Sequence, residues 1–138
     1  MILARIRTDA RTVRENDLVH TVVTLLNADN AAAVVVVDQD GAPVGIISER
    51  DVVRGLRDHG FALAALPARE LMTSALECCT ADDSIDSVAH RMIGGGFRHM
   101  PVVRHGRLIA VLSVLDVLKV HVTEIEFENL RMRQAMVG

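Results

Sequence analysis

The sequence is almost free of aromatic residues. It contains no tryptophan and no tyrosine, and its 138 residues include three phenylalanines, Phe61, Phe97 and Phe127. A hydrophobic core must therefore be aliphatic, and half of the residues are apolar, which is enough to build one. Proteins that hold single-stranded nucleic acid stack bases on aromatic rings, and those that hold a duplex carry a positive field. Because the net charge is −3 as well, we expect no nucleic-acid partner.

Cysteines and long apolar runs are also scarce. The two cysteines, Cys78 and Cys79, are adjacent, and neighbours in a chain rarely form a structural disulfide, so we predict that they pack as small apolar groups in a short strand. No apolar run approaches the roughly 20 residues of a membrane helix. Residues 1–11 carry charges at Arg5, Arg7 and Asp9, where a signal peptide would be apolar. We therefore predict a cytoplasmic protein with no membrane partner.

The residues that usually carry catalysis or bind metals form no recognisable set. The six histidines have neither acids nor cysteines at the spacing of a metal site. No serine or cysteine stands with a histidine and an acid in a pattern typical of a nucleophile and its base. We predict no metal site and no catalytic residue, and therefore a protein that is not an enzyme.

The chain contains an internal repeat. Residues 34–51 read VVVVDQDGAPVGIISERD, and residues 100–116 read MPVVRHGRLIAVLSVLD. In both, an apolar strand, a turn containing glycine and a second apolar strand lead into Ser-x-x-Asp and a helical pattern, which predicts two hairpins. Ser48 and Asp51 of the first copy recur 65 residues later as Ser113 and Asp116.

A helix is predicted before each hairpin, capped by Asn16 and Asp17 in the first copy and by residues 82–84 in the second. Short extended pieces, residues 11–13 and 77–80, precede these helices. Gly94, Gly95 and Gly96 follow a helix and precede a strand, which favours a helix C-cap over a phosphate-binding loop. We divide the chain into a first repeat with its linker (1–66), a second repeat (67–122) and a helical extension (123–138).

Each repeat of about 60 residues buries too little apolar surface to be more than marginally stable alone. The first hairpin is apolar on both faces, so both faces should be covered. Two repeats that pack face to face about a pseudo-twofold axis would cover them. This packing predicts an α/β fold with a cleft along the junction.

The ordered pair of repeats resembles the cystathionine-β-synthase (CBS) domain, which occurs in tandem as a CBS pair or Bateman module. The matching segments are VVVVDQDGAPVGIISERDVVRGL, ARELMTSALECCTADDSI and RHMPVVRHGRLIAVLSVLDVLK. The resemblance implies two β-α-β-β-α repeats and a regulatory module rather than a catalyst. It also implies an adenosine-containing ligand between the repeats, namely AMP, ADP, ATP or NAD(H), with S-adenosylmethionine as an alternative, and no required cofactor.

The Ser-x-x-Asp motifs have two compatible interpretations. The first is a capping box, in which the serine caps the helix and the acid reaches back to the cap N–H. The second is a ligand seat, because a helix N-terminus suits phosphate and a carboxylate can accept bonds from ribose hydroxyls. By resemblance, Asp51 and Asp116 hold ribose, and Ser48 and Ser113 line the same pockets.

Basic residues near these motifs are candidates for contacts with phosphate. Arg50 and Arg54 lie four apart on one helix face, where the alternative is a solvated surface, and the second copy has Leu115 and Lys119 there. Arg98 and His99 precede a strand, and by resemblance they touch phosphate. We expect the cleft that uses Asp51 to bind more tightly than its counterpart. The full candidate set is Ser48, Arg50, Asp51, Arg54, Arg98, His99, Met100, Pro101, Ser113, Asp116 and Lys119.

The tail after Asp116 has helical periodicity. Apolar residues with one asparagine recur at spacings of four and three, at Leu118, Val122, Ile125, Asn129, Met132 and Met136. This heptad seam indicates either a helix that lies on its own domain or a dimer contact, and we predict a homodimer. We expect an effector protein that acts in trans. A protein-interaction module without a small ligand remains the alternative function.

Overall fold

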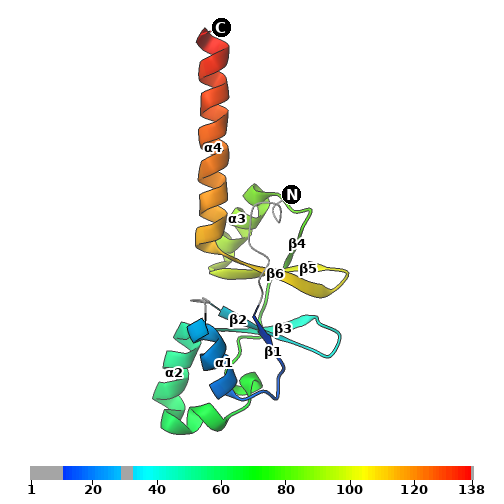
Figure 1. The fold of residues 1–138 in the computed structure, drawn as a ribbon, viewed down its shortest axis with the longest axis vertical. Helices are drawn as coiled ribbons and strands as arrows, with labels where there is room; N and C mark the ends of the chain where they lie inside the picture. The colour runs from blue at the N-terminus through cyan, green and yellow to red at the C-terminus, as the bar shows by residue number, and fades with distance from the viewer. Residues whose placement is uncertain (1–10, 29–32, 138) are drawn as a thin grey trace.

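The structure is a computed structural model that describes residues 11–28 and 33–137. Its elements form two similar units, and the last helix of the second unit is long and extends beyond it (Figure 1). The first unit contains β1 (Thr12–Val13), α1 (Val19–Asn27), β2 (Ala33–Val37), β3 (Pro43–Ser48), α2 (Glu49–His59) and the short 3-10 helices η3 (Gly60–Ala65) and η4 (Ala68–Glu70). The second contains β4 (Cys79–Thr80), α3 (Ile85–Gly95), β5 (His99–Arg104), β6 (Arg107–Ser113) and α4 (Val114–Val137).

The two sheets have the same topology. In each, a two-residue strand pairs in parallel with the first hairpin strand, which pairs antiparallel with the second, giving the orders β1-β2-β3 and β4-β5-β6. Ala33 pairs with Ser48 in the first hairpin, and His99 pairs with Ser113 in the second. Each hairpin also shifts its register once, after Val36 and after Val102. The repeat read from the sequence and the α/β fold are therefore confirmed.

The two sheets face each other in the centre of the molecule, and the helices lie on the outer sides (Figure 1). Val34 and Val36 of β2 belong to the core beneath α1, while Val35 between them is also fully buried. Because successive strand residues point to opposite faces, both faces of this strand are covered, as the apolar run predicted. The hairpins also meet at their tips, where the Leu108 N–H donates to the Gly41 carbonyl at 2.9 Å.

The helix starts agree with the sequence prediction in one repeat and not in the other. Ser84 caps α3, and its hydroxyl accepts from the Ser87 N–H at 3.1 Å. The prediction that Asn16 and Asp17 cap α1 is wrong, because the N-cap is Leu18, which makes no side-chain cap bond. Leu66, which directly follows η3, supplies the cap instead, since its carbonyl accepts from the Val19 N–H at 2.9 Å.

The glycine run ends α3 as predicted. Gly96 is the C-cap in the left-handed conformation, with φ of 70°. The following amide, that of Phe97, donates to the Met92 carbonyl at 3.0 Å. A left-handed C-cap of this kind is the usual reason for a glycine at a helix end.

The segment after Leu66, residues 67–73, packs on the first unit. Ala68 is fully buried in the core of that unit, and Thr73 forms a two-bond bridge with Ile46 at the edge of β3, with N···O distances of 2.9 and 3.0 Å. Met72 lies over Gly45, and a Cβ on that glycine would come within 2.3 Å of the Met72 Sδ. The chain is thereby held along the edge of β3 before it crosses to the second unit.

The tail is a single helix, as predicted. Val117 and Val120 of α4 are buried in the core of the second unit with α3, and the rest of α4 projects away from both units (Figure 1). In the part of the chain that the structure describes, no helix is long and apolar enough to cross a membrane.

Candidate functional site

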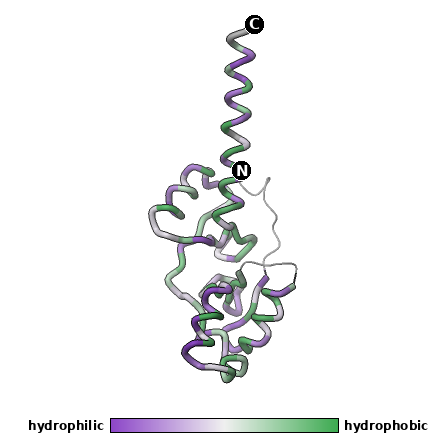
Figure 2. Tube along the Cα trace, turned by 90° about the vertical axis from the view of Figure 1, so that its left-hand side faces the viewer, coloured by the Kyte–Doolittle hydropathy of each residue, from purple (hydrophilic) through white to green (hydrophobic). Residues whose placement is uncertain are grey.

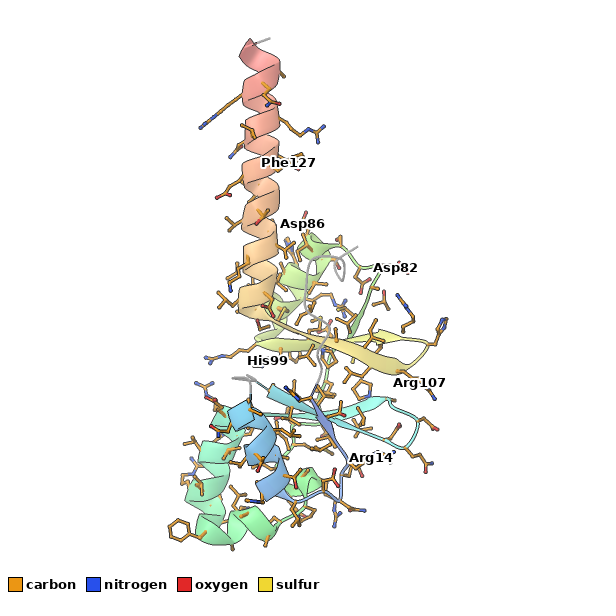
Figure 3. The ribbon with its side chains drawn as sticks, viewed as in Figure 1. Arg14, Asp82, Asp86, His99, Arg107 and Phe127 are labelled. Atoms are coloured by element: carbon orange, nitrogen blue, oxygen red, sulfur yellow. The ribbon has the colours of Figure 1, made fainter. Side chains whose placement is uncertain are left out.

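A cleft of about 450 Å³ opens at the junction of the two units. Its walls come from three places, which are the β3–α2 junction, the segment that crosses between the units, and the entry to β5. Figure 3 shows His99 at this junction, on the side of the second unit. The lining residues are Ile46, Ser48, Glu49, Arg50, Asp51, Arg54, Thr73, Ala75, Leu76, Glu77, Gly96, Phe97, Arg98 and His99.

The Ser-x-x-Asp motif of the first unit forms the capping box that its spacing predicted. Asp51 Oδ2 accepts from the Ser48 N–H at 2.8 Å and from the Ser48 hydroxyl at 3.1 Å. The Asp51 side chain is 7% exposed, although it carries a charge and lines the cleft. A carboxylate held in this way keeps a fixed orientation at the N-terminus of α2.

The other oxygen of the same carboxylate, Asp51 Oδ1, accepts from the Arg54 guanidinium. The Arg54 side chain is 56% exposed, so its charge remains largely hydrated. An ion pair with so exposed a partner contributes little, about 0.2–1 kcal/mol. The Asp51–Arg54 ion pair is therefore weak, and it occupies Oδ1, the carboxylate oxygen that Ser48 does not bind.

Further basic groups reach the cleft from both units. Arg50 comes from α2, and Arg98 and His99 come from the entry to β5. The pKa of His99 lies below its usual value of 6.5, first because burial disfavours the charged ring and then because Arg98 is near, while Asp116 and Asp51 act weakly in the opposite sense. The imidazole is therefore neutral at pH 7 and can accept or donate a hydrogen bond.

Several cleft residues were missed by the sequence analysis. The crossing segment supplies Thr73, Ala75, Leu76 and Glu77. The Glu77 carboxylate accepts from Arg91 Nε at 2.6 Å, so its charge is partly compensated. The Thr73–Ile46 bridge that holds this segment is made by backbone groups, which leave no signal in the sequence. Phe97 could have been found, because it is one of three phenylalanines and stands beside Arg98.

The remaining predicted residues do not line this cleft. Met100 is fully buried in the core of the second unit, and Pro101 is buried as well. Ser113 and Asp116 repeat the cap at the start of α4, with the Asp116 N–H donating to Ser113 Oγ at 3.1 Å. Lys119 lies exposed on α4 at the position that Arg54 has on α2.

The chemistry of the cleft suits the binding of a polar or anionic ligand. It combines a helix N-terminus, the fixed Asp51 carboxylate, three arginines and a neutral imidazole, which are groups that recognise hydroxyls and anions. Two further carboxylates, those of Glu49 and Glu77, also line it. Among the described residues, no three histidine, cysteine or acidic side chains are grouped so that they could hold a metal ion.

The fold and the sequence have close counterparts among known proteins. The CBS domain family model matches residues 3–58 and 68–122. A CBS-domain containing protein of Agrobacterium tumefaciens is 34% identical, with a TM-score of 0.78 over 87% of this chain and 95% of that one. The cytosolic domain of the Mg²⁺ channel MgtE, solved in complex with ATP, is 28% identical, with a TM-score of 0.67 over 82% of this chain and 45% of that one.

A more distant neighbour shows the same fold. The CBS domain pair of protein MJ0100, in complex with 5′-methylthioadenosine and S-adenosyl-L-methionine, is 21% identical, with a TM-score of 0.77 over 88% of this chain and 94% of that one. Among curated relatives, an uncharacterised 17.7 kDa protein of Acidianus ambivalens is 27% identical over 78% of this chain and 64% of its own length. Two others are matched over 42% and 45% of their lengths, so the chain spans only part of these relatives. Two matched repeats, in the order and with the fold described above, establish that the chain belongs to the CBS domain family as a tandem CBS pair.

Proposed function

We propose that this CBS pair is a regulatory module that senses an adenosine nucleotide in the cleft lined by Asp51. CBS pairs are regulatory ligand-binding modules and are generally not catalytic. The observation that carries the proposal is the near-complete burial of the Asp51 carboxylate at a helix N-terminus, in a cleft where arginines from both units converge. The volume of about 450 Å³ falls within the roughly 300–1,000 Å³ range of small-molecule sites.

In this proposal Asp51 accepts the ribose hydroxyls. Its Oδ2 is already engaged by Ser48, so a ribose diol reaches Oδ1, which Arg54 covers in the ligand-free protein. The ligand therefore displaces the Arg54 guanidinium from Asp51. The displaced guanidinium remains on the same helix face and becomes available to the phosphate.

The phosphate then lies between the two units. Arg50 and Arg54 approach it from α2, and Arg98 and His99 approach it from the entry to β5. Such charge-assisted hydrogen bonds are worth roughly 1.5–3 kcal/mol each. Because the phosphate holds groups from both units, a ligand favours the packing of the two repeats that brings these groups together. A shift between two packings is the regulatory output.

The arginines of the cleft discriminate among adenosine compounds, although Glu49, Asp51 and Glu77 balance their total charge. The arginines favour AMP, ADP, ATP or NAD(H), which carry phosphates, over S-adenosylmethionine, whose sulfonium is a cation. The MgtE domain in complex with ATP supports a phosphate-bearing ligand. The complex of MJ0100 with S-adenosyl-L-methionine supports the alternative, which therefore belongs in the same experiment.

A thermal-shift panel tests the proposal. The purified protein is heated with AMP, ADP, ATP, NADH, S-adenosylmethionine and, as a control for phosphate alone, inorganic pyrophosphate. A ligand at about 100 times its Kd stabilises the native state by about 2.7 kcal/mol, so at least one adenosine nucleotide should raise the melting temperature. If none does at millimolar concentration, the nucleotide proposal is wrong and a protein-interaction module without a small ligand is favoured.

A further inference from the structure

The helix α4 exposes an apolar seam. In the heptad notation abcdefg, Leu115 and Val122 occupy position a, and Leu118, Ile125 and Met132 occupy position d. All five side chains are between 44% and 64% exposed. Figure 2 shows apolar residues recurring among polar ones along the projecting part of this helix. The seam is not needed by the core, because the buried residues of α4, Val117 and Val120, lie on another side of the helix.

A polar residue interrupts this seam once, and its position is informative. Asn129 follows Val122 by seven residues, so it also occupies position a, and it is exposed. A single asparagine at position a favours a pair of helices in register, because it can then bond to the same asparagine of the second helix. An asparagine that faced Ile125 of an antiparallel partner would lack this bond.

We propose that α4 forms a parallel, in-register, two-stranded coiled coil with α4 of a second copy of this chain. This proposal concerns the helix alone and does not rest on the nucleotide cleft. Its symmetry puts both CBS pairs at the same end of the coil. The projecting half of α4, which leaves the two units (Figure 1), supplies most of the contact.

The charges that flank the seam also select the parallel arrangement. Glu128 occupies position g and Arg133 the following position e, and a parallel dimer places each Glu128 beside Arg133 of the second copy. An antiparallel pair with the same apolar layers would instead place Glu128 beside Glu128 and Glu126 beside Glu126. Arg131 does not relieve this repulsion, because its guanidinium lies over the Phe127 ring, 5.8 Å from the centroid. Figure 3 shows Phe127 on the projecting part of α4.

Charge reversal tests the pairing of Glu128 with Arg133. Sedimentation equilibrium should give a dimer for the wild-type chain, and E128R should weaken it by about tenfold, because two attractive contacts become repulsive and each exposed pair changes affinity by up to about fivefold. The double variant E128R/R133E should recover the wild-type affinity. A monomeric wild type, a larger oligomer, or a double variant as weak as E128R would overturn the proposal. Circular dichroism of each variant reports whether α4 remains helical.

A disulfide experiment tests the direction of the helices. In the parallel dimer the two residues at position 132 are neighbours, so M132C should cross-link to itself under mild oxidation. In the antiparallel dimer Met132 would face Val122, and the two residues at position 132 would be about 15 Å apart, so M132C would cross-link to V122C in a mixture and not to itself. The wild-type protein, oxidised in the same way, shows whether the native Cys78 and Cys79 form cross-links of their own. Self-linking by M132C supports the proposal, and linking only to V122C overturns it.

Discussion

The contact between Arg54 and Asp51 leads to an unusual prediction for the variant R54M. The guanidinium covers the carboxylate oxygen that a ribose diol needs, so removing it should help a ligand that has ribose but no phosphate. Since the Arg54 side chain is 56% exposed, breaking the pair costs about 0.2–1 kcal/mol. Adenosine should therefore bind R54M more tightly than wild type, by at most about fivefold.

The same variant should bind a phosphorylated ligand less tightly. It loses a charge-assisted hydrogen bond to the phosphate, worth roughly 1.5–3 kcal/mol. Part of this loss is offset, because the ligand no longer has to break the Arg54–Asp51 ion pair. The net loss is about 0.5–3 kcal/mol, or roughly twofold to a hundredfold in Kd for AMP. Isothermal titration calorimetry with adenosine and AMP, at one ionic strength, measures both effects.

The matched control is R57M, on the same helix. Arg57 pairs with Asp58 at 3.0 Å and does not line the cleft, so its loss should leave both ligands unaffected. If R54M binds adenosine more weakly than wild type while it unfolds at the same temperature, Arg54 positions Asp51 rather than covering it. The displacement step would then be wrong.

Three further predictions concern the protein without ligand. Burial lowers the folded-state pKa of His99 below 6.5, so as pH drops the unfolded chain takes up a proton before the folded protein does. The folded protein therefore keeps its stability above pH 6.5 and loses stability as pH drops through the folded-state pKa. Urea unfolding of H99Q should show a smaller loss than wild type between about pH 7 and pH 5. Burial raises the pKa of the Cys79 thiol to about 11, so iodoacetamide at about pH 8 should label it in urea and spare it in native protein. G45A should lose roughly 1–3 kcal/mol of unfolding free energy, because Met72 covers that site. The control G94A should not be destabilised, because a Cβ added there meets nothing within 4 Å. Equal losses for the two variants in urea titrations would refute the packing argument.

Much of the cleft could be predicted because its residues are tied to local signals. Ser48 and Asp51 follow an apolar strand and start a helix, which is a pattern that the sequence shows directly, and the structure has the capping box there. The repeat then indicated that groups from both units meet, and Arg54 and Arg98 do line one cleft. Their roles toward a ligand remain predictions.

The rest depends on contacts between distant parts of the chain. The Leu66 carbonyl, 47 residues from Val19, receives the first amide of α1, so the asparagine and aspartate before that helix are not needed as caps. Met100 follows His99 in β5, and strand alternation turns its side chain to the core face instead of the cleft. The period of two along a strand therefore distinguishes Met100 from His99.

The most direct test of the central proposal compares two equivalent aspartates. D51N and D116N each alter a helix cap of the same kind, and only Asp51 lines the cleft. Calorimetric titration with the nucleotide that gives the largest thermal shift should show D51N weakened by about tenfold or more, because a charge-assisted bond is lost. D116N should bind within about twofold of wild type. Equal affinities for D51N and the wild-type protein would contradict the assignment of Asp51 to the ribose.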